Sequence, residues 1–152
     1  MQKIRPFLWF DGKAEEAMNF YISIFKNSKI VNVSRSGGEG RVSGCTFQLD
    51  GHEFIALNGG PQFTFSPAIS FFVNCEMQPE VDELWEKLSA GGEKGRCGWL
   101  KDKYGVSWQV IPSVLGKMLQ DSDAMKAKRV AKAMLQMGKI DIHTLKQAYD
   151  QG

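Results

Sequence analysis

The sequence predicts an α+β protein made of two consecutive strand–helix–three-strand (βαβββ) units and a C-terminal helical tail. Strand-like runs flank one amphipathic helix in each half of the chain. When the first helix is shifted onto the second, Ala17 falls on Val81 and Tyr21 on Trp85, so the two apolar stripes coincide. From residue 113 onward the pattern is helical only. Each half alone would leave one apolar sheet face exposed, and two halves can cover each other.

The first unit is expected to span residues 3–58 of a single domain of 152 residues. Residues 3–10 are rich in aromatic side chains and predict a strand, and residues 13–27 carry apolar side chains at helical spacing. Asp50-Gly51 predicts a hairpin turn, because both central residues of a type I′ turn need positive φ. Three further strands are expected at residues 30–35, 42–49 and 54–57.

The second unit is expected to span residues 67–111 and to repeat this order. Residues 68–73 predict its first strand, and Pro79 fits the first turn of a helix, where its missing N–H costs nothing. The apolar stripe of that helix consists of Val81, Leu84, Trp85 and Leu88. Two shorter strands are expected at residues 96–101 and 106–111.

The tail is expected to cover residues 113–150 as short helices. Ser122 or Asp123 can cap one of them, and Asp141 can cap the last. We expect the tail to pack on the outside of the sheets or across a partner subunit. The basic face of its KAKRVAKAML segment is interpreted as solvated.

Charge and cysteine content limit the partners and the cellular compartment that the sequence predicts. The formal net charge is +2, with 19 basic and 17 acidic side chains, which indicates neither nucleic acid nor a membrane surface as a partner. The three cysteines are far apart and form no CxxC pair, which favours a reducing, cytoplasmic location. No apolar run approaches the length of about 18 residues that a membrane-spanning helix needs.

Three long stretches carry a resemblance to a known family: PFLWFDGKAEEAMNFY, FIALNGGPQFTFSPAISFFVNC and GRCGWLKDKYGVSWQVIP. Together with the tandem units they resemble PhnB-like proteins, which are labelled the 3-demethylubiquinone-9 3-methyltransferase domain family. This group is part of the vicinal oxygen chelate superfamily, which also includes glyoxalases, extradiol dioxygenases and antibiotic-resistance proteins. The resemblance covers residues 3 to about 150. It implies an open mixed-sheet barrel, the glyoxalase/bleomycin resistance/dioxygenase fold, and a homodimer.

The same resemblance implies where a metal site would lie. Metal-dependent members place His or Glu on the first and last strand of each unit, facing the barrel interior. The corresponding positions of this chain carry Arg5 or Pro6, Ala56, Ala68 and Gln109. None supplies the carboxylate or imidazole that divalent ions usually need. His52 and His143 are expected on the surface, so we expect no bound metal.

The sequence also predicts neither a nucleotide-like cofactor nor methyltransferase activity. Gly38, Gly40 and Gly44 form a GxGxxxG pattern, but loops that bind phosphate or S-adenosylmethionine lie between a strand and a helix. This run joins two strands and predicts a hairpin loop. Cys97 beside Trp99 could be a nucleophile, but with no histidine predictably placed to deprotonate it, a packed or half-buried thiol is favoured.

The alternating run Val106–Ile111 turns Gln109 to the face opposite Trp108. An amide there is costly to bury without partners, so either Asn58 or Ser70 satisfies it, or it faces a ligand. The leading hypothesis is a metal-free protein that binds a small organic molecule in an aromatic-lined cavity, with an enzymatic activity left open. The candidate ligand-binding residues are Trp9, Asn58, Ser70, Trp99 and Gln109.

Two alternatives belong to other functional classes. A metal-dependent lyase or dioxygenase would need ligands at positions other than those above. An antibiotic-sequestering resistance protein would favour an acidic groove for a cationic drug, and the interior rows of the predicted strands carry no acidic cluster.

Overall fold

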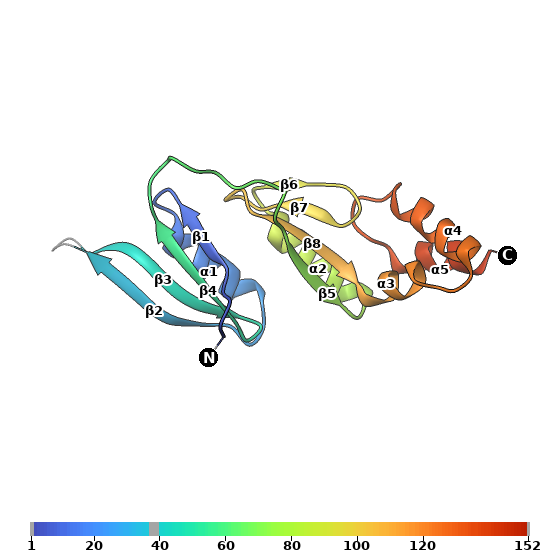
Figure 1. Ribbon diagram of the computed structural model, residues 1–152, viewed down its shortest axis with the longest axis horizontal. Coiled ribbons are helices and arrows are strands. Elements are labelled where there is room, and N and C mark those ends of the chain that lie inside the picture. The colour runs from blue at the N-terminus through green and yellow to red at the C-terminus, as the bar shows by residue number, and fades with distance from the viewer. Residues whose placement is uncertain (1, 37–39, 152) are drawn as a thin grey trace. The chain divides into compact units, whose positions relative to one another are not determined.

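The computed structural model describes residues 2–36 and 40–151 and divides into two compact units, with the boundary between Phe65 and Ser66. Each unit contains one four-stranded mixed sheet and one helix that packs on it (Figure 1). Over the described residues neither sheet closes on itself. The α+β class and the two βαβββ units are confirmed.

The first unit has the sheet order β1-β4-β3-β2, in which β1 is parallel to β4 and the other neighbours are antiparallel. Its elements are β1 (Phe7–Phe10), α1 (Ala14–Ile24), β2 (Lys29–Ser36), β3 (Arg41–Leu49) and β4 (His52–Asn58). The turn between β3 and β4 is the predicted hairpin, because Asp50 and Gly51 have φ of 50° and 77°. The glycine pattern predicted as a hairpin loop joins antiparallel β2 and β3; its Gly38 lies outside the described residues.

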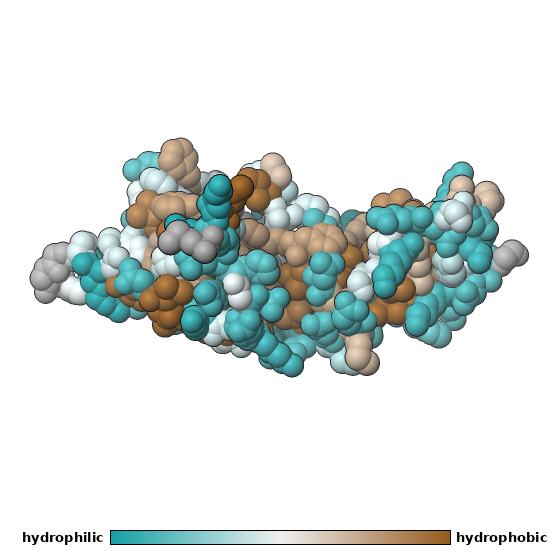
Figure 2. Space-filling model, turned by 60° about the horizontal axis from the view of Figure 1, so that its bottom comes forward, coloured by the Kyte–Doolittle hydropathy of each residue, from teal (hydrophilic) through white to brown (hydrophobic). Residues whose placement is uncertain are grey.

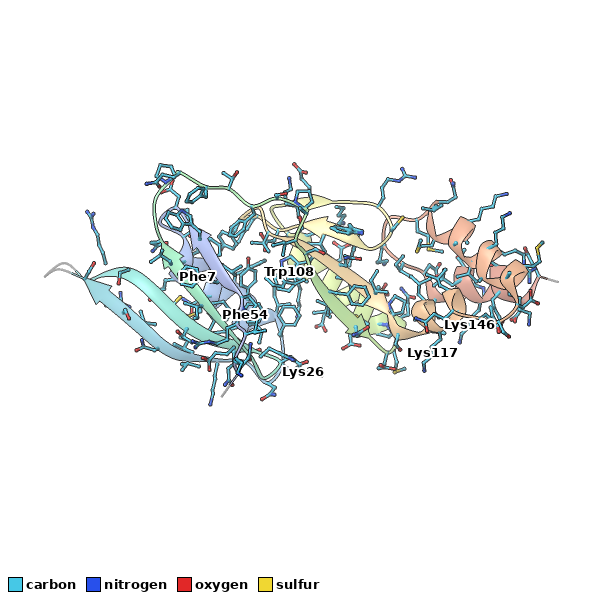
Figure 3. All side chains as sticks on the ribbon, in the orientation of Figure 1. Phe7, Lys26, Phe54, Trp108, Lys117 and Lys146 are labelled. Atoms are coloured by element: carbon cyan, nitrogen blue, oxygen red, sulfur yellow. The ribbon has the colours of Figure 1, made fainter. Side chains whose placement is uncertain are left out.

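Helix α1 covers one face of this sheet, because its apolar residues recur every three or four positions. The buried residues of α1 are Ala14, Ala17, Met18 and Tyr21. They pack with buried strand residues on alternate positions, among them Phe54 of β4, which Figure 3 labels: Leu8, Phe10, Cys45, Phe47, Leu49, Phe54 and Ala56. The opposite sheet face is left open by α1.

The second unit repeats the arrangement with the order β5-β8-β7-β6 and β5 parallel to β8. Its elements are β5 (Phe71–Cys75), α2 (Gln78–Ser89), β6 (Glu93–Lys94), β7 (Trp99–Lys101) and β8 (Ser107–Pro112). The predicted stripe of α2 is buried throughout. The identical strand order confirms the internal repeat that the two helix stripes indicate.

Two strand boundaries of the second unit differ from the prediction. The first strand begins at Phe71 rather than at residue 68, and the segment 96–101 is interrupted. Cys97 and Gly98 have φ of 56° and 84°, so the chain turns there. Their N–H groups donate to the carbonyl oxygens of Met137 and Gly138 in the tail, each at 2.8 Å, instead of joining the sheet.

The tail forms α3 (Ser113–Leu119), α4 (Ala124–Met134) and α5 (Ile142–Asp150). Asp123, rather than Ser122, caps α4, and Asp141 caps α5 as predicted. The helices enclose a small apolar core with the end of β8: Ile111, Leu115, Met118, Val130, Ile140 and Leu145. Arg129 donates to the last carbonyls of α5, so part of the basic face expected to be solvated is used inside the tail.

The tail is attached to the second unit by polar contacts as well. The Gln78 amide at the start of α2 donates to the carbonyl of Ile140 and accepts from the N–H of Ile142, at 2.9 and 2.8 Å. Lys139 forms an ion pair with Asp82 at 2.8 Å. Helices long and apolar enough to cross a bilayer are absent from the part of the chain that the structure describes.

Candidate functional site

A cavity of about 380 Å³ lies in the second unit between the sheet and the tail. This volume is within the range of about 300–1,000 Å³ that is usual for small-molecule sites. Its walls consist of strand, loop and tail residues: Phe72, Asn74, Cys97, Trp99, Gln109, Ile111, Pro112, Ser113, Leu115, Gly116, Leu119 and Met134. Figure 2 shows apolar (brown) atoms at the surface of the second unit beside the mostly hydrophilic (teal) tail.

The sheet wall is set by strand register. Gln109 of β8 is paired with Phe72 of β5 on one side and with Trp99 of β7 on the other, so these three side chains project from one face. The neighbours of Gln109 in β8, Trp108 and Val110, project to the other face and are buried there, where α2 packs. Gln109 therefore lies opposite Trp108, as the alternation predicts.

Gln109 is the central polar group of the cavity. Its Nε2 donates to the Ser70 hydroxyl at 3.0 Å, so Ser70 holds one end of the amide. No partner for its Oε1 exists among the described residues. Ser70 therefore satisfies one end of the amide, as one of the two interpretations predicts, and the other end is available at the cavity.

Asn74 and Ser113 add two polar groups to the cavity wall. Asn74 is exposed and lies two residues after Phe72, on the same face of β5. The Ser113 hydroxyl donates to Oε2 of Glu76 at 3.1 Å. None of the twelve lining residues, all within the described ranges, is charged. The cavity is therefore neutral and mostly apolar.

Trp9 and Asn58, also expected in the site, belong to the first unit and make contacts inside it. The Trp9 indole donates to the carbonyl of Gly60 at 2.9 Å and packs edge-to-face on Phe63. Asn58 accepts from the N–H of Ala14 at 2.9 Å and donates to the carbonyl of Val42 at 3.0 Å. Asn58 thus fixes the start of α1, which has no side-chain cap of its own.

The structure brings together Ser70, Trp99 and Gln109 and adds a wall formed by the tail, which the sequence pattern does not predict. Leu115, Gly116, Leu119 and Met134 form that wall. Because α3 follows β8 without a linker, a helix beside the end of β8 could be expected from the sequence. Periodicity, however, does not say which face of the sheet that helix covers.

Cys97 is half-buried, as predicted, and its Sγ lies 3.5 Å from the carbonyl of Met134. The other two thiols are structural. Burial raises the pKa of Cys45 to about 11, with a smaller effect of Glu15. Burial also raises the pKa of Cys75 to about 12. Both are therefore protonated near neutral pH, and neither lines the cavity.

The residues at the predicted metal positions do not fit a divalent cation. Arg5 forms an ion pair with Glu53 at 2.6 Å. The expectation that Ala56 faces an open interior is wrong, because alternation in β4 places it under α1, where it is 1% exposed. Ala68 is exposed and precedes β5, so it is not on an interior strand row either. Gln109 alone faces the cavity, as an amide.

Within residues 2–36 and 40–151, no three His, Cys, Asp or Glu side chains come together in a metal-binding arrangement. His52 and His143 are exposed, as predicted.

Comparison with known proteins places the chain in a family. The 3-demethylubiquinone-9 3-methyltransferase family model matches residues 2–111. The PhnB protein from Bacillus cereus is 43% identical, with a TM-score of 0.70. The match covers 74% of this chain and all of that one. A search of curated proteins found no match.

More distant structures show the fold alone. A Pseudomonas aeruginosa protein is 18% identical with a TM-score of 0.62, over 74% of this chain and 98% of that one. The fosfomycin resistance protein FosX from Listeria monocytogenes is 18% identical with a TM-score of 0.59, over 79% and 98%. The chain therefore belongs to the PhnB-like 3-demethylubiquinone-9 3-methyltransferase family, and its fold is that of the glyoxalase/bleomycin resistance/dioxygenase proteins.

Proposed function

We propose that this protein binds a small, uncharged organic molecule in the second-unit cavity, without a metal ion. The observation that carries the proposal is the Gln109 amide, which is fixed by Ser70 at one end and unpaired at the other. No buried side-chain N or O atom of the described residues lacks a partner, so this oxygen is open to solvent at the wall of a mostly apolar cavity and can accept from a ligand. A ligand with a hydroxyl or N–H group would satisfy it.

The walls set the remaining chemistry of the ligand. Phe72 and Trp99 flank Gln109 and offer apolar ring surface. Because the lining lacks Lys, Arg and His throughout its described residues, a phosphate or carboxylate would lose its hydration without gaining a counter-charge. A neutral molecule with one or two hydrogen-bonding groups fits best.

Binding is favoured over catalysis by the side chains at hand. General acid–base chemistry needs a group such as His, Asp, Glu, Lys or Tyr within hydrogen-bond reach of the substrate. The twelve described lining residues include none of these; Cys97 is the one thiol among them. Methyl transfer, which the family description names, is not part of this proposal.

A titration of the cavity with and without the Gln109 amide tests the proposal. A thermal-shift screen of neutral metabolites supplies ligands, and isothermal titration gives their affinities. Gln109→Leu should weaken binding roughly tenfold, since one neutral hydrogen bond contributes about 0.5–1.5 kcal/mol. Thr46→Val, which alters a smaller hollow of about 250 Å³ in the first unit, is the control and should leave affinity unchanged. Equal binding by wild type and Gln109→Leu would overturn the assignment.

We also propose a cytoplasmic homodimer. All three cysteines are free, which suits a reducing compartment. Large apolar side chains of the first unit remain exposed in the single chain, at 57% for Phe7, 49% for Ile30 and 47% for Val31. Sedimentation equilibrium at micromolar concentration should give twice the chain mass of 17.0 kDa, and a monomer would refute the dimer.

A further inference from the structure

We infer that the C-terminal tail is part of the ligand site and that Gly116 of α3 sets the size of the ligand, so that the cavity accepts a planar, ring-containing molecule lying against this helix. The inference rests on the proposed function, because it concerns the same cavity. It goes further by assigning one wall to a segment beyond residue 111, where the family match ends.

The tail that carries this wall is joined to the rest of the second unit by polar and apolar contacts. Two backbone hydrogen bonds of 2.8 Å join Cys97 and Gly98 to the tail, and the Gln78 amide bonds it twice more. Ile111 and Leu115 line the cavity and also belong to the apolar core of the tail. The wall therefore cannot shift without disrupting that core.

Gly116 lies in the middle of the part of α3 that faces the cavity. Ser113, Gly116 and Leu119 follow one another at intervals of three residues, so they lie along one stripe of the helix. All three line the cavity. Gly116, Lys117 and Leu119 are all exposed, but Lys117 is not among the lining residues (Figure 3).

The protein's own packing does not require a glycine at this position. Glycine is usually needed where φ is positive or where another atom approaches closely. Gly98, for example, has φ of 84°, and a Cβ there would lie 2.5 Å from Ile111 Cδ1. Among the described glycines, Gly116 alone has neither a positive φ nor any atom within 4 Å of its Cβ position.

A glycine inside a helix is unfavourable, because it has the greatest backbone freedom to lose. At Gly116 the missing side chain leaves open space over the helix backbone, beside the apolar side chains of Leu119 and Met134. A flat ring can approach a glycine backbone closely, and Trp99 offers ring surface on the sheet wall. The ring of the ligand would thus lie at α3, and its donor group would bond Gln109.

The test uses two neutral hydroxyl probes of different ring size, phenol and 2-naphthol, titrated against wild type, Gly116→Ala and Gly116→Leu. Gly116→Leu should weaken 2-naphthol binding at least tenfold and phenol binding less than threefold. Gly116→Ala should give a smaller loss for 2-naphthol and should raise the unfolding temperature by about 2–4 °C, because alanine favours the helix. Lys117→Leu, on the same helix, should change neither affinity.

The outcomes separate the two claims. If both probes bind wild type and weaken in Gln109→Leu, but Gly116→Leu and Gly116→Ala leave 2-naphthol binding intact, the role of Gly116 is refuted and the cavity assignment stands. If neither probe binds wild type, both claims fall. If Gly116→Leu does not fold, as judged by circular dichroism, the Gly116→Ala comparison decides: an unchanged 2-naphthol affinity refutes the inference.

Discussion

The hydrogen bond between Gln109 and Ser70 joins β8 to the segment just before β5 and orients the amide at the cavity. Sequence alternation is sufficient to place Gln109 on the face opposite Trp108, because the period of a strand is fixed. The partner of the amide could not be chosen from sequence, since Ser70 and Asn58 were equally available. Asn58 instead holds the start of α1 and the carbonyl of Val42.

Removing the Ser70 hydroxyl should loosen the Gln109 amide. Ser70→Ala is expected to weaken ligand binding about threefold to tenfold while leaving the cavity volume unchanged, because the amide then samples orientations that do not meet the ligand. Isothermal titration measures the loss. Ser66→Ala, in the same segment, removes a hydroxyl that accepts from the N–H of Ala68 and should bind as wild type does. A Ser70→Ala protein with full affinity would show that the amide needs no support.

The three thiols should differ in reactivity. At pH 8 the raised pKa values of Cys45 and Cys75, about 11 and 12, keep both thiols protonated in the folded protein. Cys97 is half-buried and lines the cavity, so a thiol reagent such as dithionitrobenzoate should modify one thiol in a fast phase.

Two controls identify that thiol. Cys97→Ser should remove the fast phase, and saturating ligand should slow it in the wild type. Fast modification of two thiols in the folded protein would contradict the burial of Cys45 or Cys75.

Among the elements, the helices of the two units follow from apolar spacing, and the β3–β4 hairpin follows from Asp50-Gly51. Periodicity does not place the break in the segment 96–101, where Cys97 has a positive φ and its N–H donates to the carbonyl of Met137 in the tail. Contacts between segments far apart in sequence do not appear in the periodicity of either segment. The tail wall of the cavity is missing from the sequence analysis for the same reason.

Helix α4 provides a matched test of capping. The sequence leaves Ser122 and Asp123 as alternatives, and Asp123 accepts from the N–H groups of Met125 and Lys126. Asp123→Ala should lower the free energy of unfolding by about 0.5–2 kcal/mol and increase hydrogen exchange in α4. Ser122→Ala should change stability by less than about 0.5 kcal/mol. Equal effects would mean that the cap does not stabilise α4.

On the scale of the whole molecule, the tandem order of the units and the family were both accessible from sequence, because each depends on long stretches rather than on single positions. The contacts that each candidate site residue makes were not accessible from sequence. Trp9 and Asn58 are engaged within the first unit, whereas Ser70, Trp99 and Gln109 meet in the second.

The whole protein should bind neither a metal ion nor S-adenosylmethionine stoichiometrically. The described lining of the cavity offers one thiol and no imidazole or carboxylate, which is too few donors to hold a divalent ion, and the β2–β3 hairpin offers no helix N-terminus to a nucleotide. Elemental analysis of purified protein should find well under one equivalent of zinc, iron, nickel or manganese, and S-adenosylmethionine should cause no thermal shift. One bound equivalent of metal would instead favour a metal-dependent lyase or dioxygenase.

Ile111 ends the segment matched by the family, lines the cavity and anchors the apolar core of the tail. On the proposed function, this side chain therefore links a ligand in the cavity to the packing of the last three helices. By mass action, a molecule that prefers the intact tail must also protect that tail against proteases. Proteolytic removal of the C-terminal helices would in turn release the ligand. Retention of the ligand and resistance of the tail to digestion would therefore report the same binding equilibrium.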